Sequence, residues 1–255
     1  MVMTNLAPPI PEDLNRVAVL LDVDGTILDL APTPREVVVP HSLRETLQRL
    51  CERTGGAVAL VSGRPISELD LLFSPLALPA IGGHGAELRV TAGKTPEAPR
   101  LPPLDPEIKR RFAAVAEAGP GIILEDKGYS LALHYRLAPD KEQLVREAAV
   151  KIAASVNGAI ELLPGKLVVE VKQPGVTKAT AVRELMRYPP FAGRHPIFIG
   201  DDVTDLSVFE IIPALSGTGI SVGRIVRGIE YYFERPSDVR DWLEQISRDH
   251  ALAAS

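Results

Sequence analysis

Short apolar runs alternate with stretches of helical periodicity along the first third of the chain. Residues 17–21 form a continuous apolar run, which predicts a buried strand. Leu43, Leu47 and Leu50 then recur at the spacing of a helix over residues 41–53. The same patterns predict strands at 57–61 and 78–81 and a helix at 65–72. Strands that alternate with helices in this way are typical of a doubly wound parallel sheet.

The alternation stops in the middle of the chain and returns near its end. Residues 92–106 contain five prolines, and the sequence after them predicts helix, two strands, helix, two strands up to residue 172. The turns of the two strand pairs are expected at Lys127-Gly128 and Pro164-Gly165. Helices are then expected at 177–187, 204–211 and 238–246, and strands at 196–200 and 219–222.

We therefore expect an α/β fold in which a second module interrupts the first. The predicted core is a doubly wound parallel-sheet (Rossmann-like) domain over residues 1–86 and 173–255. The predicted insertion is an α+β cap domain over residues 87–172.

Two aspartates end the first apolar run. Asp22 and Asp24 follow the strand directly, and residues two apart in a strand face the same side. Gly25 would let a phosphate approach the backbone, and the amides from Thr26 onward could donate to it. Carboxylates at the carboxyl end of a parallel strand suit Mg²⁺, and one of them could act as a nucleophile. A surface turn is the alternative, because Asp-Gly-Thr is common in turns.

A second acidic group follows the strand expected at 196–200. Asp201, Asp202 and Asp205 come directly after its apolar residues. Asp205 is four residues beyond Asp201, so both could face one site across the start of a helix. Helix capping is the alternative role for Asp202 and Asp205.

Two further stretches fit a phosphate site. Ser62 ends the second strand, where its hydroxyl and the amides of Gly63 and Arg64 could hold a phosphate. A helix cap is the alternative for Ser62, because Pro65 follows. Lys178 lies at a helix start, where a cation opposes the helix dipole. This placement favours a role in neutralising phosphate and the nucleophilic carboxylate.

The motifs Asp-x-Asp-Gly-Thr, Ser-Gly-Arg, a lysine and Gly-Asp-Asp-x-x-Asp, in this order, resemble the haloacid dehalogenase superfamily of phosphotransferases. A cap inserted before the lysine is also that superfamily's pattern. The resemblance implies that Asp22 is the nucleophile and Asp24 the general acid and base. It implies that Ser62 and Lys178 bind the transferring phosphoryl group. The implied Mg²⁺ site comprises Asp22, Asp24 through its main-chain carbonyl, Asp201, Asp202 and Asp205.

Four stretches of the sequence indicate one family within this superfamily. GGHGAEL, EDKGYSLALHYR, VVEVK and GDDVTDLSVF are similar to the trehalose-6-phosphate phosphatases, over nearly the whole chain. This similarity implies that the cap residues Glu125, Lys127 and Glu170 hold sugar hydroxyls. It also implies that His84, Gly85 and Arg136 lie near a cleft between cap and core.

The cap residues have structural alternatives. Glu125, Lys127 and Glu170 could be a solvated strand face with cross-strand ion pairs. His84 lies between glycines and could be a turn or hinge residue. His134 lies in an alternating strand, and a packing role is expected for it.

Composition and charge narrow the expectations further. The chain is 45% hydrophobic with a net charge of −5, which argues against a nucleic-acid binder. No apolar run approaches the roughly 18 residues that a membrane span needs, and the first residues lack the pattern of a secretion signal. Cys51 is the single cysteine, which favours a reducing cytoplasm.

On this resemblance we expect a Mg²⁺-dependent phosphatase that releases trehalose from trehalose 6-phosphate. Its partner is a small-molecule sugar phosphate, and it is expected to be coupled in function to a separate synthase. The alternatives are a phosphatase for sucrose 6-phosphate or mannosyl-3-phosphoglycerate, a phosphomutase, and a non-catalytic sugar-phosphate sensor.

Overall fold

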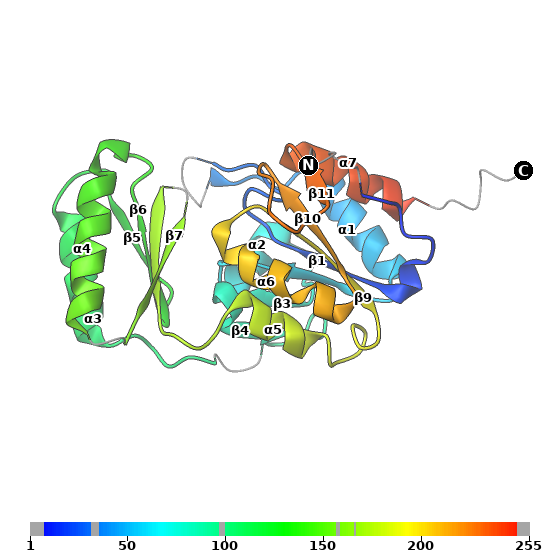
Figure 1. Ribbon diagram of the computed structural model, residues 1–255, viewed down its shortest axis with the longest axis horizontal. Helices are drawn as coiled ribbons and strands as arrows, with labels where there is room; N and C mark the ends of the chain where they lie inside the picture. The colour runs from blue at the N-terminus through cyan, green and yellow to red at the C-terminus, as the bar shows by residue number, and fades with distance from the viewer. Residues whose placement is uncertain (1–7, 32–35, 97–99, 157–158, 166, 249–255) are drawn as a thin grey trace, which may run out of the picture. The chain divides into compact units, whose positions relative to one another are not determined.

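The computed structural model describes residues 8–31, 36–96, 100–156, 159–165 and 167–248 (Figure 1). Contacts between residues divide the chain into two units. The core unit comprises residues 1–31, 37–98 and 177–255, and the cap unit comprises residues 32–36 and 99–176.

A seven-stranded sheet forms the centre of the core unit. Its strands are β1 (Val17–Leu21), β2 (Val58–Val61), β3 (Ala80–Gly82), β4 (Glu87–Arg89), β9 (His195–Gly200), β10 (Thr218–Val222) and β11 (Tyr231–Phe233). They lie in the order β11-β10-β9-β1-β2-β3-β4, and β4 alone is antiparallel to its neighbour. The helices of this unit are α1 (His41–Arg53), α2 (Ile66–Phe73), α5 (Lys178–Leu185), α6 (Leu206–Ile211) and α7 (Pro236–Ser247).

Alternate residues of the central strands send their side chains to opposite faces of this sheet. From β1, Val17, Val19 and Leu21 join the apolar cluster that contains α1, α2 and α7. Ala18 and Leu20 join the cluster that contains α5 and α6. Helices thus cover both faces, which explains why β1 and β2 are apolar and buried at every position.

The chain order of the strands reverses at the centre of the sheet. It runs from β1 through β2 to β3 toward one edge, and from β9 through β10 to β11 toward the other. The register pairs Leu21 with Ile199, so the residues that follow β1 and β9 emerge at the same level. Ligands of open α/β sheets bind at the carboxyl ends of strands where the order reverses.

The cap unit is an antiparallel sheet with two helices. Its strands are β5 (Ile123–Asp126), β6 (Ser130–His134), β7 (Glu161–Gly165) and β8 (Val168–Lys172), in the order β5-β6-β8-β7, and its helices are α3 (Pro106–Glu117) and α4 (Glu142–Ser155). Leu131, Leu133, Val169 and Val171 pack in one cluster with residues of both helices. α3 and α4 therefore cover one face of this sheet (Figure 1).

The expected fold class, a parallel α/β core with an α+β cap, is confirmed. Local features differ from expectation. Strand β11 was not predicted, and residues 173–176, expected in the core, belong to the cap unit. Residues 87–89, expected in the cap, form β4 of the core sheet, where Arg89 donates to both carboxylate oxygens of Asp70 at 2.8 and 2.6 Å. The turn expected at Pro164-Gly165 is wrong, because both residues pair with β8 as part of β7. β7 is an edge strand, which is where sheets tolerate a proline.

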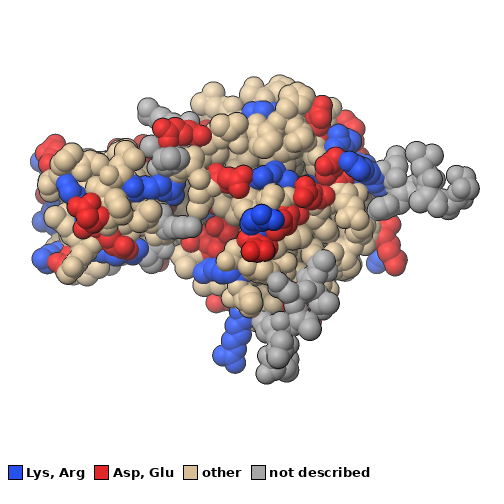
Figure 2. Space-filling view, turned by 90° about the horizontal axis from the view of Figure 1, so that it is seen from above, with Lys and Arg blue, Asp and Glu red and all other residues tan. Residues whose placement is uncertain are grey.

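No helix within the described residues is long and apolar enough to cross a membrane. Figure 2 shows acidic and basic side chains interspersed over the face that it draws. This mixture of signs agrees with the small net charge of −5.

Candidate active site

The segment after β1 is a tight backbone loop. The Asp22 amide donates to the Ile199 carbonyl at 2.9 Å, so Asp22 extends the pairing of β1 with β9. The Leu28 amide donates to the Val23 carbonyl at 3.0 Å, and the Gly25 amide donates to the Leu28 carbonyl at 2.8 Å. These bonds fix the backbone that carries Asp22 beside the end of β9.

Gly25 has a φ of +85°, in the left-handed region that favours glycine. A Cβ atom at this position would lie 2.2 Å from Oδ2 of Asp201. The glycine therefore permits both the turn and the approach of Asp201 to the loop.

Replacing Gly25 with alanine will lower the free energy of unfolding by about 3 kcal/mol, through left-handed strain and a clash. Gly228 is a matched control in the same unit, because its φ is +87° and nothing lies within 4 Å of its would-be Cβ. Gly228→Ala should lose only about 1 kcal/mol. Urea unfolding of both variants measures the difference, and equal losses would contradict the close approach of Asp201.

Three aspartates from two strand ends form a carboxylate cluster. Oxygens of Asp22, Asp201 and Asp205 lie within 4.8 Å of one another. Asp22 is 5% exposed and Asp205 is fully buried. Asp205 also accepts from the Asp202 amide at 3.0 Å, so the expected capping role applies to it. Within the described residues, this cluster does not include the side chains of Asp24 and Asp202.

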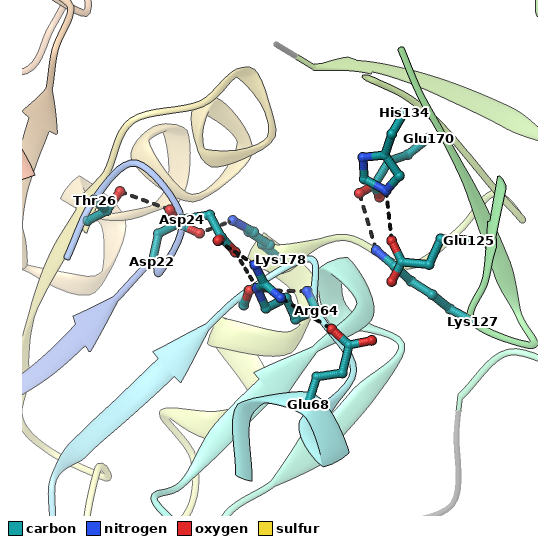
Figure 3. Close-up of polar contacts among 11 residues, drawn as sticks. Asp22, Asp24, Thr26, Arg64, Glu68, Glu125, Lys127, His134, Glu170 and Lys178 are labelled. Atoms are coloured by element: carbon teal, nitrogen blue, oxygen red, sulfur yellow. Dashed lines mark hydrogen bonds and ion pairs between the residues drawn. The ribbon is translucent and has the colours of Figure 1, made fainter. Parts of the chain in front are cut away.

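Lys178 and Thr26 contact opposite oxygens of Asp22 (Figure 3). The Lys178 Nζ donates to Asp22 Oδ1 and to Asp205 Oδ1, both at 2.7 Å. The Thr26 hydroxyl lies 2.8 Å from Asp22 Oδ2 and 3.1 Å from Asp201 Oδ1. Lys178 is the first residue of α5, which Thr177 caps, and is 3% exposed. Lys178 thus contacts the carboxylate that it is expected, from the sequence, to neutralise.

Burial and mutual repulsion alter the proton affinity of this cluster. Burial and the Asp205 charge raise the pKa of Asp22 to about 6, although Lys178 opposes the shift. Burial and the charges of Asp22 and Asp205 raise the pKa of Asp201 to about 9. Burial works against the charge of Lys178, but Asp205 and Asp22 outweigh it and raise the lysine pKa. A divalent cation would relieve the repulsion, and hard carboxylate oxygens are the ligands that Mg²⁺ prefers.

Asp24 takes part in a separate ion pair. Arg64 donates to both its carboxylate oxygens, with Nε at 2.6 Å and Nη2 at 2.7 Å (Figure 3). The Arg64 Nη1 lies 3.3 Å from Glu68, one helical turn further on. The buried Ser62 hydroxyl accepts from the Arg64 amide at 3.1 Å. No role was predicted for Glu68 from the sequence. Its i,i+4 spacing from Arg64 would have indicated this ion pair.

His84 and Gly85 lie in a one-turn 3₁₀ helix, Gly83–Gly85, after β3. The His84 amide donates to the Ser62 carbonyl at 3.0 Å. The His84 ring lies against Gly63, where a Cβ would meet Nε2 at 2.3 Å. His84 has a φ of +54°. This backbone conformation fits the alternative, given in the sequence analysis, that His84 is a turn residue.

The cap residues form a second polar group. Lys127 Nζ lies 3.3 Å from Glu170 Oε1, as the cross-strand alternative anticipates (Figure 3). The packing role expected for His134 is wrong, because its Nε2 lies 2.8 Å from Glu125 Oε2. Arg136 follows β6 in the same unit and is partly exposed.

The sequence profile of the trehalose-phosphatase family matches residues 20–228. The chain belongs to the trehalose-phosphatase family. The resemblance found in the sequence is thereby confirmed, and so is the expectation that the protein is a phosphatase enzyme.

Two relatives match most of the chain. A "Probable trehalose-phosphate phosphatase" of Sinorhizobium fredii is 42% identical over 229 residues, covering 88% of this chain and 84% of the relative. The "Trehalose-6-phosphate phosphatase" of Escherichia coli is 37% identical over 245 residues, covering 96% and 92%. The solved C-terminal domain of the Candida albicans trehalose-6-phosphate phosphatase has a TM-score of 0.81 at 20% identity, covering 97% of this chain and 99% of that one. This last likeness supports the fold.

Proposed function

We propose that this protein hydrolyses trehalose 6-phosphate to trehalose and phosphate, with Mg²⁺, through an aspartyl phosphate. The observation that carries the proposal is the buried Asp22 carboxylate, which Lys178 and Thr26 contact at 2.7 and 2.8 Å in a chain of this family. Both relatives described above are named for this activity.

In the first step an Asp22 oxygen attacks phosphorus, and the bond from phosphorus to the sugar oxygen breaks. Before this step, Asp24 leaves the ion pair with Arg64 and takes up a proton. It gives this proton to the departing oxygen, so trehalose leaves as a neutral alcohol. Lys178 neutralises charge beside the attacking carboxylate, and the Ser62 hydroxyl with the Gly63 amide binds the phosphoryl oxygens. The Arg64 amide supports this site by donating to the Ser62 hydroxyl. Gly25 and Thr26 let the loop backbone approach the same oxygens.

In the second step Asp24 takes a proton from water. The water oxygen attacks phosphorus, and the bond from phosphorus to Asp22 breaks. Phosphate leaves, and the Asp22 carboxylate and the protonated Asp24 are restored.

The donor set fits a magnesium ion. The carboxylates of Asp22 and Asp201 and the main-chain carbonyl of Asp24 would hold it. Asp205 would support it indirectly, because its oxygens already accept from Lys178 and from the Asp202 amide. Arg224 donates to the Asp202 carbonyl at 2.6 Å, so Asp202 would hold the loop in place. When bound, the ion supplies positive charge that neutralises the carboxylates and the phosphoryl oxygens.

The cap supplies the sugar-recognising groups in this proposal. Glu125 and Glu170 accept from sugar hydroxyls and Lys127 donates to a sugar oxygen. A site built for such bonds rejects analogues that lack the hydroxyls, because its polar groups would then be unpaired. His84, Gly85 and Arg136 would border the bound sugar phosphate.

Phosphate release from four esters tests the proposal. The esters are trehalose 6-phosphate, sucrose 6-phosphate, glucose 6-phosphate and mannosyl-3-phosphoglycerate, each with Mg²⁺ and with EDTA. We expect rapid release from the first alone, lost with EDTA and restored by added Mg²⁺. Mg²⁺ should also raise the melting temperature of the resting protein, because an ion bound to the native state stabilises it.

Other outcomes separate the alternatives. Release from a different sugar phosphate alone would retain the core chemistry and overturn the sugar assignment. Hexose phosphate isomerisation would indicate a phosphomutase, and binding without release would indicate a sensor. A synthase must supply the substrate, and we infer functional coupling to such an enzyme in a reducing cytoplasm.

A further inference from the structure

One face of the cap sheet is polar. The register places Glu125 opposite Ala132 and Ala132 opposite Glu170, so the two acids flank a small residue in one row across β5, β6 and β8. Successive residues of a strand point to opposite faces. Leu131 and Leu133, on either side of Ala132, pack with α3 and α4. The row of two acids therefore lies on the face opposite the helices.

His134 reaches Glu125 diagonally across two strands. It pairs in register with Ile123, two residues before Glu125, and diagonal neighbours are within reach of long side chains. Its Nε2 lies 2.8 Å from Glu125 Oε2, with side chains 18% and 24% exposed. The contact is thus partly shielded from water, which makes it stronger than a surface pair.

Glu170 has an equivalent partner. Lys127 Nζ lies 3.3 Å from Glu170 Oε1, and these side chains are 5% and 15% exposed. Each acid in the row therefore has a donor beside it (Figure 3). One row further along this face, Lys172 pairs with Glu161 at 3.1 Å.

The charge of Glu125 follows from these contacts. Burial alone would raise its pKa, but the hydrogen bond with His134 and the charge of Lys127 outweigh burial and lower it. Glu125 is therefore an ionised acceptor near neutral pH. Its Oε2 faces the imidazole, so Oε1 is the oxygen that would accept from a hydroxyl.

We propose that His134 is a positioning residue for sugar recognition, which acts by holding the Glu125 carboxylate in the orientation that accepts a sugar hydroxyl. This inference rests on the proposed trehalose 6-phosphate activity. His134 Nε2 must carry a proton to donate to the carboxylate. Glutamine at this position can donate from its amide nitrogen, whereas phenylalanine fills similar space and donates nothing.

The test compares two substrates in two His134 variants and one control variant. We expect His134→Phe to raise KM for trehalose 6-phosphate about tenfold and to leave kcat within about twofold, because a lost hydrogen bond to a charged group weakens binding. His134→Gln should restore KM to within about threefold of the wild-type value. For p-nitrophenyl phosphate, which carries no sugar, neither change should alter kcat/KM.

Lys109→Met is the matched control. Lys109 lies on α3 and pairs at 2.8 Å with Asp126, which follows Glu125 in the same strand but on the helix-covered side. Removing this ion pair should leave KM unchanged for both esters. Melting temperatures of all variants verify folding.

Three results would overturn the inference. These are an unchanged KM in His134→Phe, an equal loss on both esters, and an equal loss in the Phe and Gln variants. The last two would show a structural role. Wild-type protein that does not hydrolyse trehalose 6-phosphate would instead refute the proposed function, and this result is read before any His134 variant is compared.

Discussion

Replacement of Asp22 by asparagine will lower turnover of trehalose 6-phosphate by about 10⁴-fold or more. Asparagine has the shape of aspartate, but its neutral amide cannot attack phosphorus. The Lys178 and Thr26 contacts at 2.7 and 2.8 Å position either side chain similarly, so the site should remain assembled. Phosphate release measures turnover, and calorimetry should find substrate affinity within a few-fold of wild type.

Asp29→Asn is a suitable control for this experiment. Its side chain is 71% exposed and lies 3.1 Å from Arg240, so turnover should change by about twofold at most. Rapid acid quench of the wild-type reaction should also yield one phosphoryl group on the peptide that contains Asp22. Full activity of the asparagine variant would show that water attacks directly and that the covalent route is wrong.

Replacement of Asp24 by asparagine will lower kcat for trehalose 6-phosphate by about 10²- to 10⁴-fold. The sugar alkoxide is a poor leaving group, so it needs a proton as it departs. Asparagine does not supply this proton. p-Nitrophenolate leaves without a proton, so the first step persists for that ester while hydrolysis of the aspartyl phosphate slows. Stopped-flow absorbance should then show a burst of p-nitrophenol about equal to the enzyme concentration.

The burst separates the two roles of Asp24. Asparagine retains one oxygen that can accept one of the two Arg64 contacts at 2.6 and 2.7 Å. The backbone bonds of the loop do not involve this side chain, so the loop should keep its position. Equal slowing of both esters without a burst would contradict proton transfer by Asp24 and indicate a loss of loop structure instead.

The strands at the centre of the core could be predicted, whereas those at its edges could not. β1, β2 and β9 are covered on both faces, so they are apolar runs that stand out in the sequence. β4 and β11 have three residues each and lie at the two edges of the sheet. Short edge strands have one uncovered side and mixed sequences, and neither was expected.

The contacts of the candidate site depend on register and loop geometry. His134 meets Glu125 because β5 and β6 pair with Ile123 opposite His134, which a strand pattern does not reveal. Arg64 meets Asp24 across 40 residues of sequence. The sequence motifs therefore named candidate residues for the chemistry but did not show which of them contact one another.

By itself, the sequence determined the fold class, the central strands and the acids that follow β1 and β9, since apolar periodicity and strand ends are local properties. Only the tertiary structure decided how the charges are arranged. It places Lys178 at 2.7 Å from Asp22 across 156 residues, and it buries the cluster so that the pKa of Asp22 rises to about 6 and that of Asp201 to about 9. Burial and distance between charges set those values, and both arise only when the separate segments pack together.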